Sequence, residues 1–193
     1  MNPHFEPLLE YLNSIYPLSE QLRQDLAERL IYRKYSKKEL VLREGEINNY
    51  IYFVKSGTLR AYYEKDGEDM TSWLMTAGDV IISVYSFFTR KPSSECIETL
   101  KESELVFMHY DDLNRIYNKH VEFNVVGRKL TEYYYMKSEE RAFFMRRSRA
   151  IERYEFLEKN YPQIILEVPG KYIASYLGMT IETLSRIRNS RIN

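Results

Sequence analysis

The residues best suited to making specific polar contacts stand together near the end of the chain, around and after Gly178. Carboxylate, guanidinium and hydroxyl groups recur there within one short segment. Such groups form the donor and acceptor pairs that read base edges in the major groove of DNA. The residues predicted to contact DNA are Lys171, Thr180, Ile181, Glu182, Thr183, Ser185, Arg186 and Arg188.

Two helices and a tight turn must position this set, and residues 170–192 read GKYIASYLGMTIETLSRIRNSRI. Gly178 supplies the turn residue that tolerates positive φ, and Thr180 is a good N-cap for the second helix. The apolar positions that close the core between the helices are Ile173, Ala174, Leu177, Met179, Leu184 and Ile187. The spacing favours a helix-turn-helix over an ordinary helical hairpin, because the polar row begins where a recognition helix enters the groove.

The charge of the chain is placed unevenly. The 193 residues have a formal net charge of zero, so no global basic field indicates a nucleic-acid partner. Residues 168–193, however, hold four basic side chains (Lys171, Arg186, Arg188, Arg191) against Glu182, a local net charge of +3. Phosphate contacts need such a local excess rather than a basic whole.

Several classes of protein are disfavoured by composition. The single cysteine, Cys96, excludes disulfide frameworks and four-cysteine clusters within one chain, and three scattered histidines lack ligand spacing, so no metal site is expected. A cupin-like enzyme would need histidines on its strands, and residues 40–99 contain none. No secretory leader and no apolar run of about 18 residues is present. We therefore expect a cytoplasmic protein that is not an enzyme and has no membrane partner.

Most of the remaining chain is predicted to form an antiparallel β domain. Residues 5–30 show helical periodicity interrupted at Pro17, which predicts two short helices, with Ser19 capping the second. From Ile31 to Tyr110, β-rich runs alternate with turns. Turn glycines recur at spacings of 12, 10 and 11 residues (Gly45, Gly57, Gly67, Gly78), as in a β-sandwich or barrel. Residues 80–94 are expected to be irregular.

The chain turns helical again after Asp111, which with Asp112 is expected to cap a short helix. A longer helix is predicted from about Val121 to Arg141, followed by another over residues 143–161 that Pro162 ends. Apolar side chains along the longer helix alternate at spacings of three and four, as in a coiled-coil seam. The predicted dimer seam is Phe123, Val126, Leu130 and Tyr133. The alternative is that this helix simply lies on the β domain.

This order of elements resembles the Crp/Fnr family of bacterial transcription regulators over nearly the whole chain. The glycine series ending in Ala77-Gly78-Asp79, the seam helix and the segment TIETLSR at 180–186 carry the resemblance. It implies an α+β fold with N-terminal helices, an antiparallel cyclic-nucleotide-binding-like β-roll (jelly roll), a long dimerisation helix and a C-terminal helix-turn-helix. The corresponding units are residues 1–110 (sensor), 111–142 (linker and dimerisation helix) and 143–193 (DNA binding), with the usual wing hairpin expected to be missing.

The resemblance also implies roles for single residues. Glu182 and Arg186 match the family's cytosine-accepting glutamate and guanine-reading arginine, whereas Ile181 replaces a further arginine, so the half-site should differ at one base pair. The implied partners are double-stranded DNA, a second copy of the chain and RNA polymerase. The alternative function is a β-roll signalling or protein-interaction module that does not bind DNA.

The sensor positions depart from the family's cyclic-nucleotide pocket. Counted from Ala77-Gly78-Asp79, Ile82-Ser83 stands where a Gly-Glu pair would hold the ribose, and Ser93-Ser94 where an Arg-Ser pair would hold the phosphate. We therefore expect no ordinary binding of cyclic AMP. The residues that would line an effector pocket are Ser83, Ser86, Arg90, Ser93 and Ser94. Two alternatives stay open: an unidentified small-molecule effector, or a β domain that is a scaffold without a cofactor or ligand.

Overall fold

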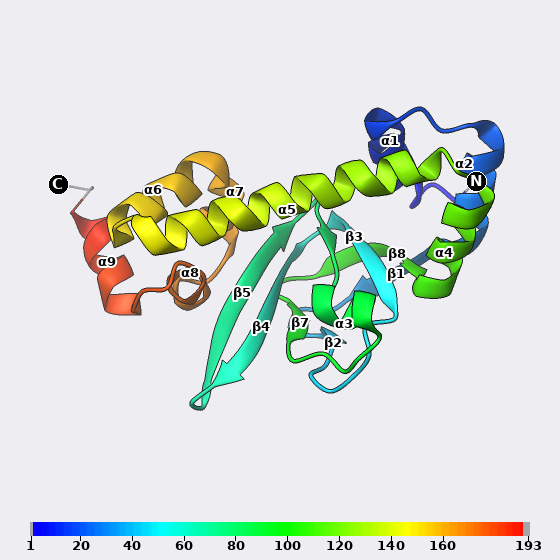
Figure 1. The fold of residues 1–193 in the computed structure, drawn as a ribbon. Coiled ribbons are helices and arrows are strands. Elements are labelled where there is room, and N and C mark those ends of the chain that lie inside the picture. The colour runs from blue at the N-terminus through cyan, green and yellow to red at the C-terminus, as the bar shows by residue number, and fades with distance from the viewer. Residues whose placement is uncertain (1, 191–193) are drawn as a thin grey trace.

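The structure is a computed structural model that describes residues 2–190, and it forms two units joined by one long helix (Figure 1). Helix α5 (Phe123–Arg147) runs across the molecule, with the β domain under one part of it and the C-terminal helices at its far end. No helix among the described residues combines the length and the apolar character needed to cross a membrane.

The β domain consists of two four-stranded antiparallel sheets, as the turn glycines predict. One sheet has the order β1-β8-β3-β6, with β1 at Ile31–Tyr35, β8 at Ser103–His109, β3 at Tyr50–Ser56 and β6 at Val80–Ile81. The other has the order β2-β7-β4-β5, with β2 at Leu40–Leu42, β7 at Cys96–Thr99, β4 at Thr58–Lys65 and β5 at Glu68–Thr76. Apolar side chains between the sheets, among them Val54, Leu59 and Leu105, are fully buried.

Gly57 shows why one turn of the roll requires glycine. It joins β3 to β4 at a φ of 109°, where an L side chain is strained. A Cβ atom there would also lie 2.1 Å from the Ser103 hydroxyl oxygen, so no larger residue fits.

Helices cover the outer face of the first sheet. Helices α1 (Glu6–Ile15) and α2 (Glu20–Arg29), separated at Pro17 and capped at Ser19 as predicted, pack with α4 (Tyr110–Lys119) and the start of α5. The Ser19 hydroxyl accepts from the Leu22 backbone N–H at 3.2 Å. The cap of α4 is different from the prediction, because the His109 side chain, not Asp111 or Asp112, accepts the exposed N–H at 3.2 Å.

Three local boundaries also differ from the sequence prediction. The segment expected to be irregular contains the short helix α3 (Val84–Thr89). Helix α5 continues to Arg147, past the expected end at Arg141, because no glycine, proline or cap residue interrupts that stretch. The break comes at Ser148, and α6 (Ala150–Asn160) starts where the Glu152 carboxylate accepts from the Arg149 backbone N–H at 2.8 Å.

The C-terminal unit is a small all-helical core. It contains α6, α7 (Pro162–Glu167), α8 (Gly170–Tyr176) and α9 (Ile181–Asn189). Its buried centre includes Leu157, Ile173, Ala174 and Leu184, and Leu74 of β5 joins the same apolar cluster. The C-terminal helices and the sheet that contains β5 therefore share packing as well as a connecting helix.

Candidate nucleic-acid interface and sensor sites

Helices α8 and α9 form the predicted helix-turn-helix. Gly178 has a φ of 62° in the turn, and a Cβ atom there would lie 2.5 Å from the Met145 methyl group of α5. The positive φ therefore favours glycine here, and a larger residue would also displace the flexible Met145 side chain. Ile173, Ala174 and Leu184 are almost completely buried between the helices.

The outward face of α9 presents a row of polar side chains. Glu182, Ser185 and Arg186 are exposed, and Arg186 contacts the half-buried Thr183 hydroxyl at 3.4 Å. The Thr180 hydroxyl accepts from the Thr183 backbone N–H at 3.2 Å, so this N-cap is as predicted. The Glu182 backbone N–H, followed by the Thr180 side chain, lowers the pKa of the Glu182 carboxyl, which keeps an acceptor on this face.

Two other residues of the predicted set flank this row. Ile181 is 45% exposed beside Gly170, and Lys171 is exposed on α8. Arg188 does not belong to the outward face: its guanidinium carbon lies 5.6 Å from the Tyr154 ring of α6, and its Nη2 atom is buried. Position 188 lies one helical turn after Leu184, on the core side of α9, which explains this correction. Arg191 lies outside the described residues.

Three of the residues predicted to line the effector pocket, Ser83, Ser86 and Ser93, form hydrogen bonds with one another or with Asn48. We define the serine hub as Asn48, Ser83, Ser86 and Ser93, all of them buried. The Asn48 side chain accepts from the Ser83 backbone N–H at 2.6 Å and donates to the Tyr50 carbonyl at 2.7 Å. The Ser86 hydroxyl accepts from the Asn48 backbone N–H at 2.9 Å. Ser93 donates to Ser83 at 3.0 Å, so the two serines at the altered positions bind each other.

Arg90 and Ser94 do not join the serine hub as ligand-binding groups. Arg90 lies at the end of α3 in a left-handed conformation (φ 59°), and its guanidinium donates to the Asn48 carbonyl at 2.8 Å and to the Asn49 side chain. The same guanidinium stacks 4.1 Å from the Tyr110 ring. Ser94 is exposed. Arg90, predicted to line the effector pocket, thus anchors neighbouring segments in this structure.

The predicted dimer seam is divided between buried and accessible positions. Phe123 and Val126 are 4% and 0% exposed within the core of their own protomer, which corrects the seam assignment at these two positions. Their spacing of three is that of a helix lying on the β domain, the alternative left open by the sequence. Leu130 is partly buried against the same core and Tyr133 is 41% exposed, so the seam stays a prediction there. The opposite side of α5 exposes Tyr135, Met136 and Phe143.

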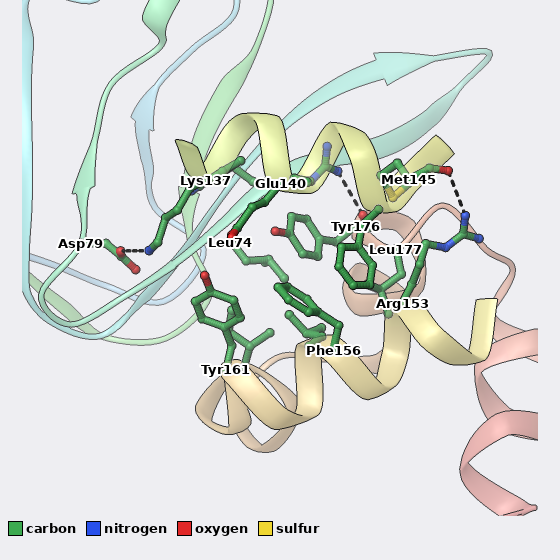
Figure 2. Close-up of a pocket in the computed structure, with 15 residues that line it drawn as sticks. Leu74, Asp79, Lys137, Glu140, Met145, Arg153, Phe156, Tyr161, Tyr176 and Leu177 are labelled. Carbon is green, nitrogen blue, oxygen red and sulfur yellow. Dashed lines mark hydrogen bonds and ion pairs between the residues drawn. The ribbon is translucent and has the colours of Figure 1, made fainter. Parts of the chain in front are cut away.

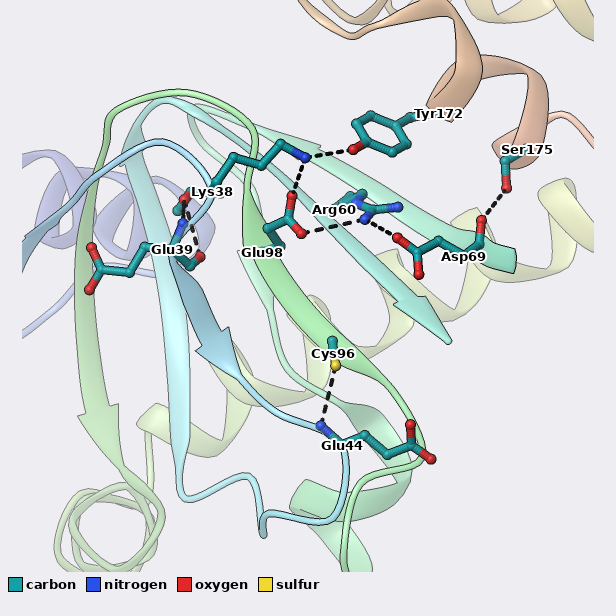
Figure 3. A network of polar contacts seen from close by, with 10 residues as sticks. Lys38, Glu39, Glu44, Arg60, Asp69, Cys96, Glu98, Tyr172 and Ser175 are labelled. Carbon is teal, nitrogen blue, oxygen red and sulfur yellow. Dashed lines mark hydrogen bonds and ion pairs between the residues drawn. The ribbon is translucent and has the colours of Figure 1, made fainter. Parts of the chain in front are cut away.

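A second polar network, centred on a buried arginine, joins the β domain to α8, and Figure 3 shows it. We define the interdomain latch as Lys38, Arg60, Asp69, Glu98 and Tyr172. Arg60, only 1% exposed, pairs with Asp69 at 2.6 Å and with Glu98 at 3.4 Å. Its guanidinium carbon lies 4.0 Å from the Tyr172 ring of α8, while Nε and Nη1 are buried without a hydrogen-bond partner.

Further contacts of the same kind surround the latch. Lys38 bridges Glu98 at 3.0 Å and the Tyr172 hydroxyl at 2.6 Å. The Ser175 hydroxyl of α8 accepts from the Thr71 backbone N–H of β5 at 2.8 Å. Sequence reasoning missed this network. Its only signal was a charged residue in the middle of the strand sequence TLRAYYE.

Comparisons with known proteins agree with this architecture. Residues 32–120 match the family of cyclic nucleotide-binding domains. The anaerobic regulatory protein of Pasteurella multocida (strain Pm70) is 26% identical over 194 residues, covering 89% of this chain and 67% of that protein. The structure of FixK2 from Bradyrhizobium japonicum is similar at a TM-score of 0.69 and 25% identity, with 83% of both chains covered.

A more distant structure shares the fold. The catabolite activator protein of Thermus thermophilus has a TM-score of 0.57 at 15% identity, with 93% of this chain and 85% of that chain covered. The predicted fold class is thus confirmed, and the relatives named here are regulatory proteins.

Proposed function

We propose that this chain, which belongs to the Crp/Fnr family of regulators, binds a two-fold-related DNA site as a homodimer and regulates transcription. The observation that carries the proposal is the exposed row of Glu182, Ser185 and Arg186 on α9, held on a buried helix-turn-helix core. In this proposal, Arg186 donates to a guanine and Glu182 accepts from a cytosine amino group. Lys171 and Thr183 contact the phosphate backbone, and RNA polymerase is the further partner.

The proposed unit boundaries follow the predicted ones with one adjustment. Residues 1–110 act as the sensor, and residues 143–193 hold the DNA-binding helices. Helix α5 connects them without interruption through residue 142, up to Arg147. A rotation of α5 relative to its partner would therefore be transmitted directly to α6 and α9.

Dimerisation is proposed through the outer side of α5. Tyr135, Met136 and Phe143 are 66%, 58% and 52% exposed there, whereas Phe123 and Val126 are used within the protomer. Met136→Asp should yield a monomer in sedimentation experiments, because pairing would bury a charge without a partner. Glu139→Asp, on the same exposed stretch, keeps the charge already present and serves as the control.

The sensor domain is proposed not to bind cyclic AMP in the usual way. Ser83 stands at the position that would bind the ribose, and Ser93 at the position that would bind the phosphate. Each supplies a neutral hydroxyl, and the two hydroxyls are hydrogen-bonded to each other. A buried cyclic phosphate requires a cation, commonly an arginine that binds it through two hydrogen bonds. Calorimetric titration with cyclic AMP checks this, and micromolar affinity would contradict it.

The test of DNA reading separates base contacts from phosphate contacts. We would select a preferred site from random duplexes and then measure affinity for that site and for unrelated DNA. Arg186→Ala should weaken specific binding by about 1–3 kcal/mol, and Lys171→Ala should weaken binding to all sequences alike. Arg115→Ala, at an exposed arginine on α4 outside the DNA-binding unit, is the matched control.

The rival function predicts another outcome. A protein-interaction module without DNA binding would select no sequence from the random pool, and Arg186→Ala would leave the weak nonspecific affinity almost unchanged. That result would refute the assignment of α9 as the recognition helix.

A further inference from the structure

A cavity lies at the junction of the three parts of the molecule, away from the serine hub (Figure 2). Its volume is about 60 Å³. Leu74 of β5, Arg141 and Phe144 of α5, Phe156 of α6 and Tyr176 of α8 all contribute to its walls. A molecule bound there would contact the sensor sheet, the long helix and the helix-turn-helix at once.

The walls combine aromatic rings with charged groups of both signs: Lys137, Arg141 and Arg153 are basic, and Asp79 and Glu140 are acidic. Phe144 and Phe156 stack with ring centroids 4.2 Å apart, and Figure 2 shows Phe156, Tyr161 and Tyr176 pointing into the same space. At one side, Lys137 is 3.4 Å from the Asp79 carboxylate. The charge of Lys137 is thus neutralised within the protein, and this ion pair does not need a ligand.

Arg141 and Arg153 are different, since neither forms an ion pair within 4 Å among the described residues. Arg141 donates to the Tyr176 carbonyl at 3.0 Å, and Arg153 donates to the Met145 and Gly178 carbonyls at 3.3 Å. The Nε atom of each guanidinium is buried and has no hydrogen-bond partner. Two positive charges with unused donors therefore line one cavity.

A purely structural explanation accounts for only part of this arrangement. Carbonyls at the end of a helix lack intrahelical donors, so arginines near the end of α8 satisfy them. That explains the bonds made by the terminal guanidinium nitrogens. It does not provide either guanidinium with a negatively charged partner, since neither arginine has a carboxylate within 4 Å among the described residues. A small anion in the cavity would provide that charge.

We propose that this cavity is a binding site for a short aliphatic monocarboxylate, of the size of acetate or propionate. The carboxylate would accept from Arg141 and Arg153, and the alkyl group would contact Phe144 and Phe156. A volume of about 60 Å³ corresponds to roughly two water molecules, which suits a ligand of three to five heavy atoms. Charge-assisted hydrogen bonds to a carboxylate are the interactions for which arginine geometry is suited.

The site would couple occupancy to DNA binding, an extension that rests on the function proposed above. Arg141 belongs to α5 and Arg153 to α6, and both reach carbonyls at the end of α8. An anion bridging them would fix α8 against α5 and thereby the direction of α9. Binding to the free protein does not depend on that function and can be measured alone.

Trp73 is the single tryptophan of the chain and lines the cavity, so its fluorescence reports on occupancy. Sodium propionate, titrated against sodium chloride at equal ionic strength, should give a saturable change with a millimolar dissociation constant. Propionamide has the same shape without the charge and should bind at least about tenfold more weakly. Arg141→Gln and Arg153→Gln should each lose about tenfold in affinity for propionate.

Arg146→Gln is the matched control, because Arg146 is exposed on the same helix and bonds only to the Ala142 carbonyl one turn away. It should bind propionate as the wild type does. Thermal melts establish that each variant is folded, and should Arg141→Gln fail to fold, Arg153→Gln decides alone. A signal that does not saturate, or equal binding of propionamide, would overturn the proposed site.

The coupling is tested by DNA affinity with and without saturating propionate. A change of about threefold or more in the wild type, absent in Arg153→Gln, supports it. Propionate binding without any change in DNA affinity would refute the coupling but not the site. Absence of sequence-specific DNA binding under all conditions would instead refute the proposed function, so the two failures are distinguishable.

Discussion

Two polar networks with buried centres, the serine hub and the interdomain latch, differ in how completely their buried atoms are paired. In the serine hub, the side chains of Asn48, Ser83, Ser86 and Ser93 have no buried polar atom without a partner among the described residues. In the interdomain latch, Arg60 has two such atoms, and its remaining bonds go to carboxylates on neighbouring strands. The hub lies within one unit, whereas the latch is closed by Tyr172 of another.

This difference indicates what each network can do. A complete set of neutral hydrogen bonds fixes three chain segments and offers nothing to an incoming phosphate. The latch contains charged groups that water would solvate if α8 moved away from the β domain. Separating α8 would therefore expose charges to water and would not break a complete set of hydrogen bonds like that of the hub. We therefore regard the hub as a fixed support and the latch as the contact through which the β domain holds the helix-turn-helix.

The largest expected effect is that of removing the latch cation. Arg60→Met leaves the buried Glu98 with only the half-exposed Lys38 as a partner and should lower the free energy of unfolding by up to about 3–5 kcal/mol. The double variant Arg60→Met with Glu98→Leu should recover most of this loss, because the carboxylate that lost its arginine is gone as well. Urea unfolding of both variants measures the difference. If the double variant were as unstable as the single one, the electrostatic account of the latch would be wrong.

The serine hub should be the next most sensitive network. Asn48→Ala deprives the Ser83 N–H and the Tyr50 carbonyl of their partners. Each unpaired buried group costs about 1–3 kcal/mol, so a loss of roughly 2–4 kcal/mol in unfolding free energy is expected. Asn118→Ala, at an exposed position of α4, should change stability by less than about 0.5 kcal/mol and is the control. Near-wild-type stability of Asn48→Ala would mean that the hub does not support the roll.

A smaller effect is expected at the cover of the latch. Tyr172→Phe removes the hydroxyl that Lys38 contacts at 2.6 Å and leaves the ring over Arg60. Because Lys38 is half-exposed, the loss should be about 0.5–1 kcal/mol. Denaturant midpoints measure it, with Tyr63→Phe at a more exposed site as the control. If Tyr172→Phe lowered the free energy of unfolding as much as Asn48→Ala, the latch could not be distinguished from the serine hub as the more easily separated contact.

The contrast between the networks also explains what the sequence could and could not predict. The helix-turn-helix was predictable because Gly178, Thr180 and the apolar spacing act locally. The inward face of α5 was not, since a three-and-four period fits a partner helix and the chain's own β domain equally well; the burial of Val126 decides between them. The latch depends on Arg60, Glu98 and Tyr172, which are brought together only by sheet pairing and by the docking of α8.

The smallest expected effect is a dependence of the latch on alkaline pH that the hub should lack. Burial raises the pKa of the Tyr172 phenol, but the hydrogen bond from Lys38 and the charge of Arg60 lower it further, so the net shift is downward. A group whose pKa is lower in the folded state adds stability as pH rises toward its unfolded value, here near 10. The stability difference between wild type and Tyr172→Phe should therefore grow from about pH 8 to about pH 10. The hub contains only serine and asparagine side chains, so the difference between wild type and Asn48→Ala should stay constant over the same range. Urea midpoints at matched pH values give both curves. If the stability difference between wild type and Tyr172→Phe were as constant with pH as that of Asn48→Ala, the Tyr172 phenol would not interact with the charges of Lys38 and Arg60. The latch would then not extend from the β domain to α8.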